Sequence, residues 1–103
     1  MARRVRSHTF RGKRYSIQHV SPSKLNSKRD AKKYDRCLGL CEPPTKKKKR
    51  ILLDNTIDGL EELRVTLHEA QHACHWDMCE EAVDDSTWDM AKFLWRLGYR
   101  KVQ

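Results

Sequence analysis

The alternation of hydrophobic and polar positions divides the chain into an N-terminal part with strand periodicity and a C-terminal part with helix periodicity. Up to Asp54, apolar residues recur at alternate positions in short runs, which is typical of half-buried strands. From Asp58 onward they recur at steps of three and four residues, as on one face of a helix. This order of patterns predicts an α+β domain in which a short, mostly N-terminal sheet precedes two packed helices.

The strand-like part predicts a hairpin and two further short strands. Residues 3–20 carry β-branched and aromatic side chains in partial alternation, and Gly12 supplies the turn signal. Residues 37–41 and 50–54 are two expected strands, joined by a loop with two prolines and a run of lysines. The polar and basic stretch 21–36 is expected to be a surface connection with room for one short helical turn.

The first expected helix begins at Asp58 and ends near Trp76. Asp58 followed by Glu61 resembles a capping box, in which a carboxylate accepts a hydrogen bond from an amide of the first turn. The apolar stripe of this helix is expected to consist of Leu60, Leu63, Leu67, Ala70 and Cys74.

The second expected helix begins between residues 77 and 79 and runs to Leu97. Gly98 follows it directly, and glycine at this position commonly ends a helix because it adopts the left-handed conformation without steric cost. Its apolar stripe is expected to consist of Val83, Thr87, Met90, Ala91, Leu94 and Leu97.

Charge is distributed unevenly along the 103 residues, a length that suits one domain. The 22 Lys and Arg exceed the 14 Asp and Glu, which gives a net charge of +8. Residues 1–50 hold most of the basic side chains and residues 54–89 most of the acids. The basic half favours an anionic partner, with nucleic acid the usual case, or else forms a solubilising surface.

The expected location of the protein is the cytoplasm. No run of apolar residues approaches the roughly 18 needed to span a membrane. The N-terminal MARRVRSHTF has basic residues but lacks the apolar core of a secretory signal. In a reducing compartment the four cysteines are expected to be thiols or metal ligands rather than disulfides.

Residues 68–72 have the sequence His-Glu-Ala-Gln-His, an H-E-x-x-H pattern in the middle of the first expected helix. The i, i+4 spacing places His68 and His72 on one face, so that both imidazoles can reach a single zinc ion. Glu69 lies about 100° further round the helix, where it can reach a water on the metal more easily than the metal itself. The pattern predicts a zinc site with Glu69 as general base, and the alternative is a polar face with solvated histidines.

A catalytic zinc site needs a third protein ligand and an open position for water. His75 follows His68 at a distance of roughly 10 Å along the helix axis, too far to share one ion comfortably. The longer motif with a third histidine is absent, because Met78 occupies that position. The third ligand is therefore expected to be a carboxylate on the second helix.

Two neighbouring acids, Glu80 and Glu81, compete for this role. Measured from Val83 in the apolar stripe, Glu80 lies about 60° away around the helix and Glu81 about 160° away. Helical phase favours Glu80, with Asp84 one turn later as hydrogen-bond acceptor for a zinc-binding histidine. Glu80 also has another interpretation, as the N3 residue of a capping box that begins at Asp77.

The segments HEAQH and EEAVDD resemble the gluzincin metallopeptidases, which pair H-E-x-x-H with a glutamate on the following helix. RILLDNT followed by LRVTLHEAQHA is similar to the strand-then-helix entry of ImmA/IrrE-like and SprT-like zincin domains. The compact chain and its closing WDMAKFLWRLGYR look most like small HExxH proteins of phages and bacteria. The resemblance covers residues 37–97.

The resemblance implies a single minimal zincin-like domain over residues 1–103. Residues 1–36 would form a basic hairpin and loop, and residues 37–103 the metal-site core. In such domains the strand that precedes the metal-binding helix, here residues 50–54, borders the cleft and pairs with an extended peptide substrate. A bacterial cell or a phage-infected host is the implied location.

Family patterns leave both candidate ligand pairs open. The thermolysin-type run Asn-Glu-Ala-x-x-Asp would align Glu81 with the ligand and Asp85 with its supporting carboxylate. The ExxAD-like pattern of other gluzincins aligns Glu80 and Asp84 instead, in agreement with helical phase. We therefore prefer the second pair.

The activity implied by the resemblance is hydrolysis of a peptide bond by a Zn²⁺-activated water. His68, His72 and Glu80 would hold the ion, and Glu69 would move the proton from the water to the leaving amine. The alternative, from another class, is a non-catalytic nucleic-acid-binding or phage accessory protein with a structural zinc site. Larger gluzincins add a histidine or tyrosine that stabilises the oxyanion, for which the candidates are His19, His75 and Tyr99.

The cysteines offer a rival metal site. Cys37-x₃-Cys41 and Cys74-x₄-Cys79 could together form a Cys₄ zinc site, although their spacings are looser than the usual C-x₂-C. Cys74 also has a place on the apolar stripe, where a reduced thiol is ordinary. The tryptophans at 76, 88 and 95 are expected to pack in the core or at helix edges, away from the lysines.

Overall fold

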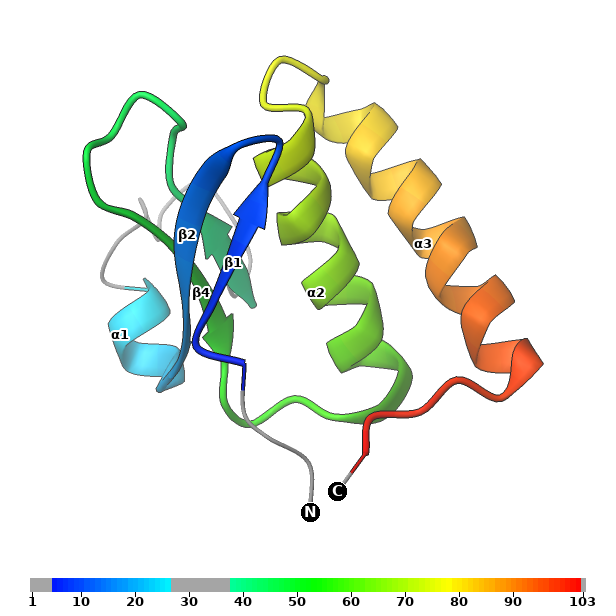
Figure 1. Ribbon diagram of the computed structural model, residues 1–103. Coiled ribbons are helices and arrows are strands. Elements are labelled where there is room, and N and C mark those ends of the chain that lie inside the picture. The colour runs from blue at the N-terminus through cyan, green and yellow to red at the C-terminus, as the bar shows by residue number, and fades with distance from the viewer. Residues whose placement is uncertain (1–4, 27–37, 103) are drawn as a thin grey trace.

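A four-stranded mixed sheet comes first along the chain, and two packed helices follow it (Figure 1). The computed structural model describes residues 5–26 and 38–102. The α+β class and the order of sheet before helices are thus confirmed.

The predicted hairpin is formed by β1 (Ser7–Phe10) and β2 (Lys13–Val20), which pair antiparallel. Arg11 and Gly12 make the two-residue turn with φ values of 49° and 79°. Positive φ at both central residues gives the turn a twist that matches the right-handed twist of the strands. Gly12 adopts this conformation freely because it has no Cβ.

The sheet has the order β1-β2-β4-β3, where β3 is Gly39–Cys41 and β4 is Lys49–Asp54. β4 pairs parallel with β2, with Ile17 opposite Ile51, and antiparallel with β3. A parallel pair needs a crossover connection. The described part of that connection contains the short helix α1 (Pro22–Asn26), which lies within the stretch where one helical turn was expected.

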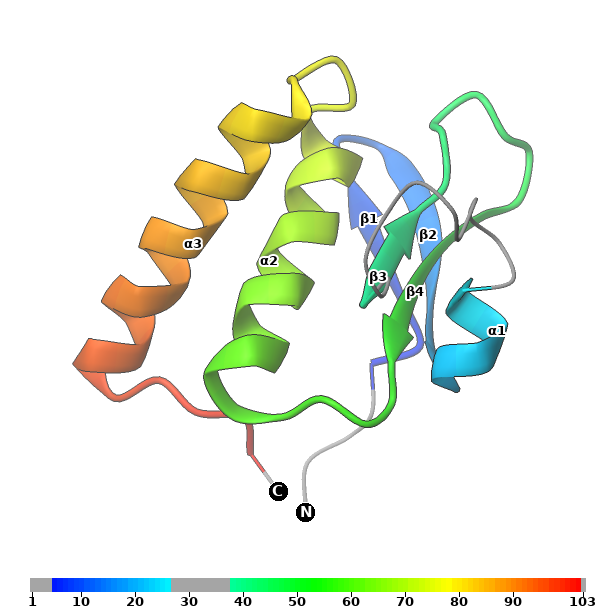
Figure 2. The same ribbon diagram turned by 180° about the vertical axis from the view of Figure 1, so that it is seen from behind.

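Alternate residues of β4 pack on opposite faces of the sheet. Ile51 and Leu53 join the larger core with Val65 of the first long helix, whereas Leu52 packs with Leu25 of α1. The short helix and the long helices accordingly lie on opposite sides of the sheet (Figure 2). The alternation in β4 therefore fixes which helix covers which face.

The long helices are α2 (Gly59–Cys74) and α3 (Glu80–Leu97), close to their expected bounds. Gly98 has φ 97°, and its N–H donates to the carbonyl oxygens of Leu94 and Trp95, so it ends α3 as expected. The capping box expected at Asp58 is wrong: Asp58 is the N-cap residue, but its side chain makes no capping hydrogen bond. None of the helices in residues 5–26 and 38–102 combines the length and apolar character needed to cross a bilayer.

The expected apolar stripe of α2 is only half-buried, and a different face is covered by the sheet. Val65, Glu69 and Ala73, at i, i+4 and i+8, are buried, whereas all five stripe residues are intermediate. The prediction is wrong because α2 lies between the sheet and α3 and therefore contacts protein on two sides (Figure 1). On α3, the stripe is buried at Val83, Thr87 and Ala91, half-buried at Leu94 and exposed at Met90 and Leu97.

Candidate metal centre

One face of α2 brings two imidazoles together. His68 and His72 lie one turn apart, with ring centroids 4.8 Å apart and the Nε2 atoms 3.1 Å apart. Both side chains are largely buried, with 11% and 14% of their surfaces exposed. The i, i+4 spacing thus aims the same ring nitrogen of each histidine at one point.

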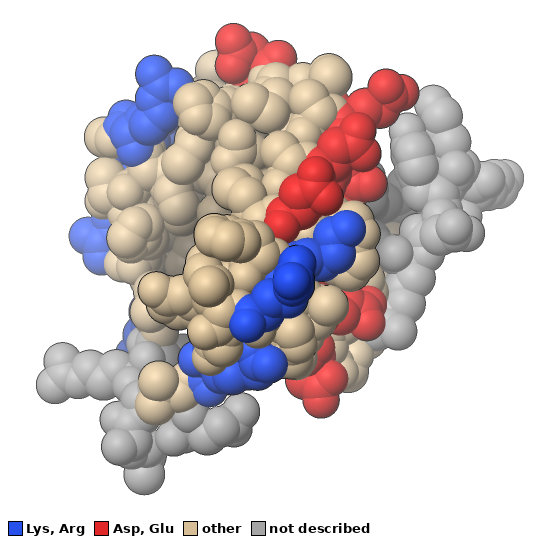
Figure 3. Space-filling view, turned by 90° about the vertical axis from the view of Figure 1, so that its right-hand side faces the viewer, with Lys and Arg blue, Asp and Glu red and all other residues tan. Residues whose placement is uncertain are grey.

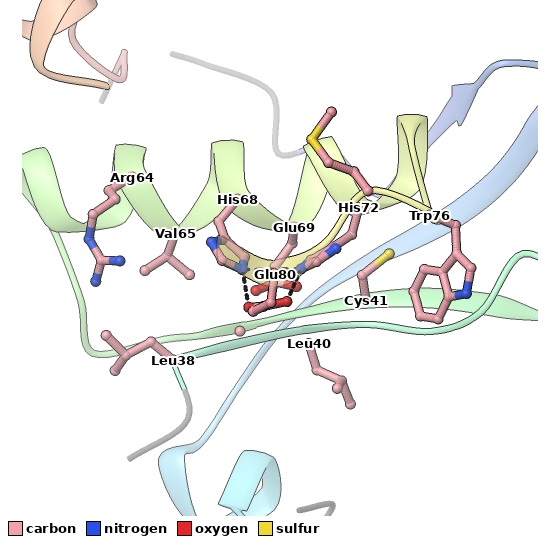
Figure 4. Close-up of a pocket in the computed structure, with 12 residues that line it drawn as sticks. Leu38, Leu40, Cys41, Arg64, Val65, His68, Glu69, His72, Trp76 and Glu80 are labelled. Carbon is pink, nitrogen blue, oxygen red and sulfur yellow. Dashed lines mark hydrogen bonds and ion pairs between the residues drawn. The ribbon is translucent and has the colours of Figure 1, made fainter. Parts of the chain in front are cut away.

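The first residue of α3 closes this group. Glu80 Oε1 lies 2.8 Å from His68 Nε2, and Glu80 Oε2 lies 2.9 Å from His72 Nε2 (Figure 4). The donor atoms of the three residues all lie within 4.8 Å of one another. In the described part of the chain, no other group of three or more His, Cys, Asp or Glu side chains gathers in this way.

The geometry and the donor types of this group suit a divalent metal ion. Zinc binds imidazole nitrogen and carboxylate oxygen at about 2.0–2.2 Å, which places tetrahedral donors roughly 3.3 Å apart. The observed separations of 2.8–3.1 Å are within a few tenths of an ångström of that value. Two histidines and one carboxylate also leave a fourth position for water or substrate. His68, His72 and Glu80 therefore form a possible metal site.

Of the two competing glutamates, the structure places Glu80 in the group, and Glu81 is exposed outside it. The capping-box interpretation of Glu80 is wrong, because α3 begins at Glu80 with Cys79 as its N-cap residue. Asp84 follows one turn later, and its Oδ1 lies 3.4 Å from Nδ1 of His68. Asp85 is exposed and, within the described residues, forms no ion pair with either histidine.

Glu69 lies in the interface between α2 and β3. Only 7% of its surface is exposed, although it is a carboxylate. A Cβ atom added to Gly39 would lie 2.9 Å from both Cγ and Oε2 of Glu69. The side chain of Glu69 can therefore rest against β3 only because residue 39 has no side chain.

A cleft of about 500 Å³ runs between α2 and β3 and contains the three donors and Glu69 (Figure 4). The strand at this cleft is β3, at the edge of the sheet. β4 lies between β2 and β3 and pairs with both, so the expectation that residues 50–54 border the cleft and pair with substrate is wrong. The remaining lining residues are Leu38, Gly39, Leu40, Cys41, Arg64, Val65, Trp76 and Met78.

None of the three candidates for stabilising an oxyanion lines this cleft. His19 and Tyr99 line a different, more apolar groove on the other side of α2, next to β1 and β2. His75 is exposed, and its Nδ1 lies 3.4 Å from a guanidinium nitrogen of Arg11. The cleft instead contains Arg64, which sequence reasoning missed although it lies one turn before His68 on the same helix.

The described cysteines do not form a metal group. Cys41 is buried, Cys74 is half-buried and Cys79 is exposed, and Cys37 lies outside the described residues. Burial, followed by the nearby charge of Glu69, raises the pKa of the Cys41 thiol to about 12.

The tryptophans lie at helix edges. Trp76 lines the cleft, Trp88 has the guanidinium of Arg64 at 5.6 Å from its ring centroid, and Trp95 has that of Arg100 at 3.4 Å. Trp76 and Trp88 are 44% and 38% exposed. Trp88 and Trp95 thus lie at helix edges as expected, but Trp88 is not away from the lysines, since Lys92 Nζ lies 5.3 Å from its ring centroid. Trp76 belongs to the wall of the cleft.

Comparisons with protein-family models, with curated proteins and with solved structures found no match to this chain. The functional argument therefore rests on the geometry of the site.

Proposed function

We propose that the protein is a zinc-dependent metallopeptidase of the gluzincin-like HExxH kind. The observation that carries this proposal is the convergence of His68, His72 and Glu80 in the wall of an open cleft that also contains a buried glutamate. Zinc held by these residues would supply Lewis-acid chemistry, which polarises a carbonyl and makes water a better nucleophile. The open fourth position distinguishes this arrangement from a closed structural site.

Glu69 is the general base of the proposed reaction. Figure 4 shows it between the two histidines on α2, with its carboxylate in the cleft. It takes a proton from the attacking water and then donates that proton to the amine that leaves from the cleaved peptide bond. Its contact with β3 holds the carboxylate in place, which general acid–base catalysis requires.

Asp84 orients His68. A carboxylate 3.4 Å from Nδ1 favours the tautomer with the proton on that nitrogen, which leaves the Nε2 lone pair for a metal ion. The proposed substrate is a peptide in extended conformation, because the cleft runs along β3 at the edge of the sheet.

The test compares four proteins in zinc content and in cleavage of a mixed peptide library followed by mass spectrometry. We expect the wild type to bind one zinc ion and cleave peptides. Glu69→Gln should retain the zinc and lower the cleavage rate roughly 100-fold to 10,000-fold. Glu80→Gln should lose zinc affinity, whereas the matched control Glu81→Gln should keep both properties. Full cleavage by Glu69→Gln, or unchanged zinc affinity in Glu80→Gln, would contradict the proposal.

A second candidate function is binding of nucleic acid without catalysis, with any zinc in a structural role. The parallel pairing of β2 with β4 places the start of both strands at the same end of the sheet. The turn of the hairpin and the lysine loop that precedes β4 therefore lie at one end of the molecule (Figure 1). The basic side chains of these two segments are Arg11, Lys13, Arg14, Lys46, Lys47, Lys48 and Lys49.

A further inference from the structure

Arg64 is the only Lys or Arg among the described residues that line the cleft. It lies one helical turn before His68 on α2. Figure 4 shows its guanidinium on the same side of the helix as the imidazole of His68, near Leu38. The remaining ionisable residues around it are the donor group, Glu69 and the thiol of Cys41. Positive charge is thus confined to the Leu38 end of the cleft.

Two residues of α3 lie beside Arg64. Its NH1 atom lies 3.9 Å from Oδ1 of Asp84, and its guanidinium carbon lies 5.6 Å from the ring centroid of Trp88. The distance to Asp84 exceeds the 2.7–3.2 Å of a hydrogen bond. Asp84 therefore attracts the guanidinium electrostatically but accepts no hydrogen bond from its N–H groups. No hydrogen bond links the side chain of Arg64 to another residue in the described chain, which leaves its five N–H groups available to a ligand.

The position of Arg64 argues against direct contact with the reacting carbonyl. Asp84 contacts both Arg64 and the Nδ1 atom of His68, whereas the metal-facing atom of His68 is Nε2. The imidazole ring therefore separates the guanidinium from the donor atoms, and an oxyanion needs a donor within about 3 Å. Successive residues of an extended peptide lie roughly 3.3 Å apart. A residue next to the scissile bond can therefore reach the guanidinium of Arg64.

We propose that Arg64 binds a carboxylate of the substrate close to the scissile bond. The cleft would then select peptides that present either an acidic side chain or a C-terminal carboxylate at its Leu38 end. A guanidinium suits this role because its planar fork of donors matches a carboxylate in two parallel hydrogen bonds. This inference rests on the proposed peptidase function and assigns it a substrate class.

The test uses hexapeptides of alanine and glycine with blocked ends, one neutral and six with a single Glu at each position in turn. A further peptide has a free C-terminal carboxylate. Affinities for the zinc-loaded Glu69→Gln protein are measured by calorimetry. We expect the preferred carboxylate peptide to bind roughly 10-fold to 100-fold more tightly than the neutral one. The peptide series identifies the source of the carboxylate, as a side chain at one position or as the chain terminus.

Arg64→Gln should abolish this preference, and Arg64→Lys should restore only part of it, because an ammonium lacks the planar fork. Arg96→Gln is the matched control: it removes the same charge from an exposed position of α3 and should leave the preference intact. In the otherwise unaltered enzyme, Arg64→Gln should raise KM for acidic peptides more than KM for neutral peptides. A merely structural role would change kcat and KM for both kinds of peptide by the same factor.

Equal binding of neutral and acidic peptides, no binding of any peptide, or a preference that survives Arg64→Gln would overturn the inference. Its failure can be told apart from failure of the proposed function. Zinc binding with Glu69-dependent cleavage but no carboxylate preference would remove only the role of Arg64. If the protein binds no zinc but shows a carboxylate preference that depends on Arg64, the carboxylate-binding role of the cleft stands and the proposed peptidase function is wrong.

Discussion

The carboxylate of Glu69 rests against a strand position that has no side chain. We expect Gly39→Ala to displace it, because the added Cβ would approach Cγ and Oε2 of Glu69 and Cγ1 of Val65 to 2.9 Å. A displacement of about 1 Å in a catalytic group lowers the rate roughly 100-fold. Zinc affinity should change less, because the three atoms nearest to the added Cβ belong to Glu69 and Val65 and not to the metal donors. Peptide cleavage and zinc affinity are measured side by side.

Gly12→Ala is the control for this substitution. Gly12 has nothing within 4 Å of an added Cβ, but its φ of 79° is unfavourable for alanine. This variant should therefore be less stable and retain its rate of cleavage at a temperature where it is folded. Wild-type cleavage by Gly39→Ala would show that the contact with β3 does not position Glu69.

Local spacing was sufficient to predict the residues that now lie in the candidate site. The i, i+4 pattern singled out His68 and His72, and helical phase favoured Glu80, whose oxygens the structure places beside both imidazoles. The contributions of Gly39 and Arg64 were missed. Gly39 matters only because β3 packs on a helix some thirty residues later, and the contacts of Arg64 depend on the packing of α3.

At the level of elements, one buried acid connects the lysine loop to β4. Glu42 is 7% exposed, and its oxygens accept hydrogen bonds of 2.9 and 3.0 Å from Arg50, in addition to one from Lys46. The hydrogen bonds from Arg50 are the largest cause that lowers the pKa of Glu42 from 4.5 to about 2. The folded protein thus holds this carboxylate ionised at a pH where the unfolded chain would protonate it.

The resulting stabilisation is fully present above pH 4.5 and is lost as the pH falls toward 2, since the unfolded chain binds the proton first. We expect the free energy of unfolding to fall by roughly 2 kcal/mol over this range because of Glu42. Urea denaturation at pH 5 and pH 2.5 measures the loss. Glu42→Gln should lower stability at pH 5 and reduce the dependence on pH, whereas Glu61→Gln, at an exposed position of α2, should retain the wild-type slope.

The elements themselves were predictable where the signal was local. Gly12 marked the hairpin turn, Gly98 marked the end of α3, and a change of period marked the start of α2. Two predictions failed where the answer depends on distant parts of the chain. The expected apolar stripe of α2 accounted for one buried face, whereas the helix is covered by protein on two faces. In addition, nothing in the sequence of residues 50–54 indicated that β3, and not β4, would form the edge of the sheet.

At the scale of the whole molecule, the charge of the surface differs from one side to another. The outer side of α3 carries a band of acidic side chains beside a band of basic ones (Figure 3), which disfavours this side as a binding surface for a polyanion. In the hairpin turn and in the lysine loop, the single acidic residue within the described segments 11–14 and 42–49 is Glu42, which is buried and paired. The end of the sheet with these two segments is the expected contact surface if the second candidate function is correct.

We expect double-stranded DNA to bind with an affinity that falls steeply with salt, by about 0.9 logarithmic units per phosphate contact for each tenfold rise in salt. Lys47 and Lys48 are exposed in the loop, and replacing both by Gln should reduce this slope by up to about 1.8. Fluorescence anisotropy at salt concentrations from about 50 mM to about 200 mM measures the slope. Lys92→Gln with Arg96→Gln on α3 is the control. An equal effect of both pairs, or no binding, would contradict the assignment.

The sequence separations differ between the metal donors and the parallel pair in the sheet. His68 and Glu80 are 12 residues apart, whereas β2 and β4 pair residues 15 and 49, roughly three times as far along the chain. Closing the longer loop costs about 1 kcal/mol more chain entropy. The donor cluster and the wall that faces it therefore both belong to the part of the chain with local pairings, because β3 pairs with β4 over 10 to 14 residues. A change that weakens the parallel pair would loosen the β1–β2 hairpin while leaving both sides of the cleft able to form.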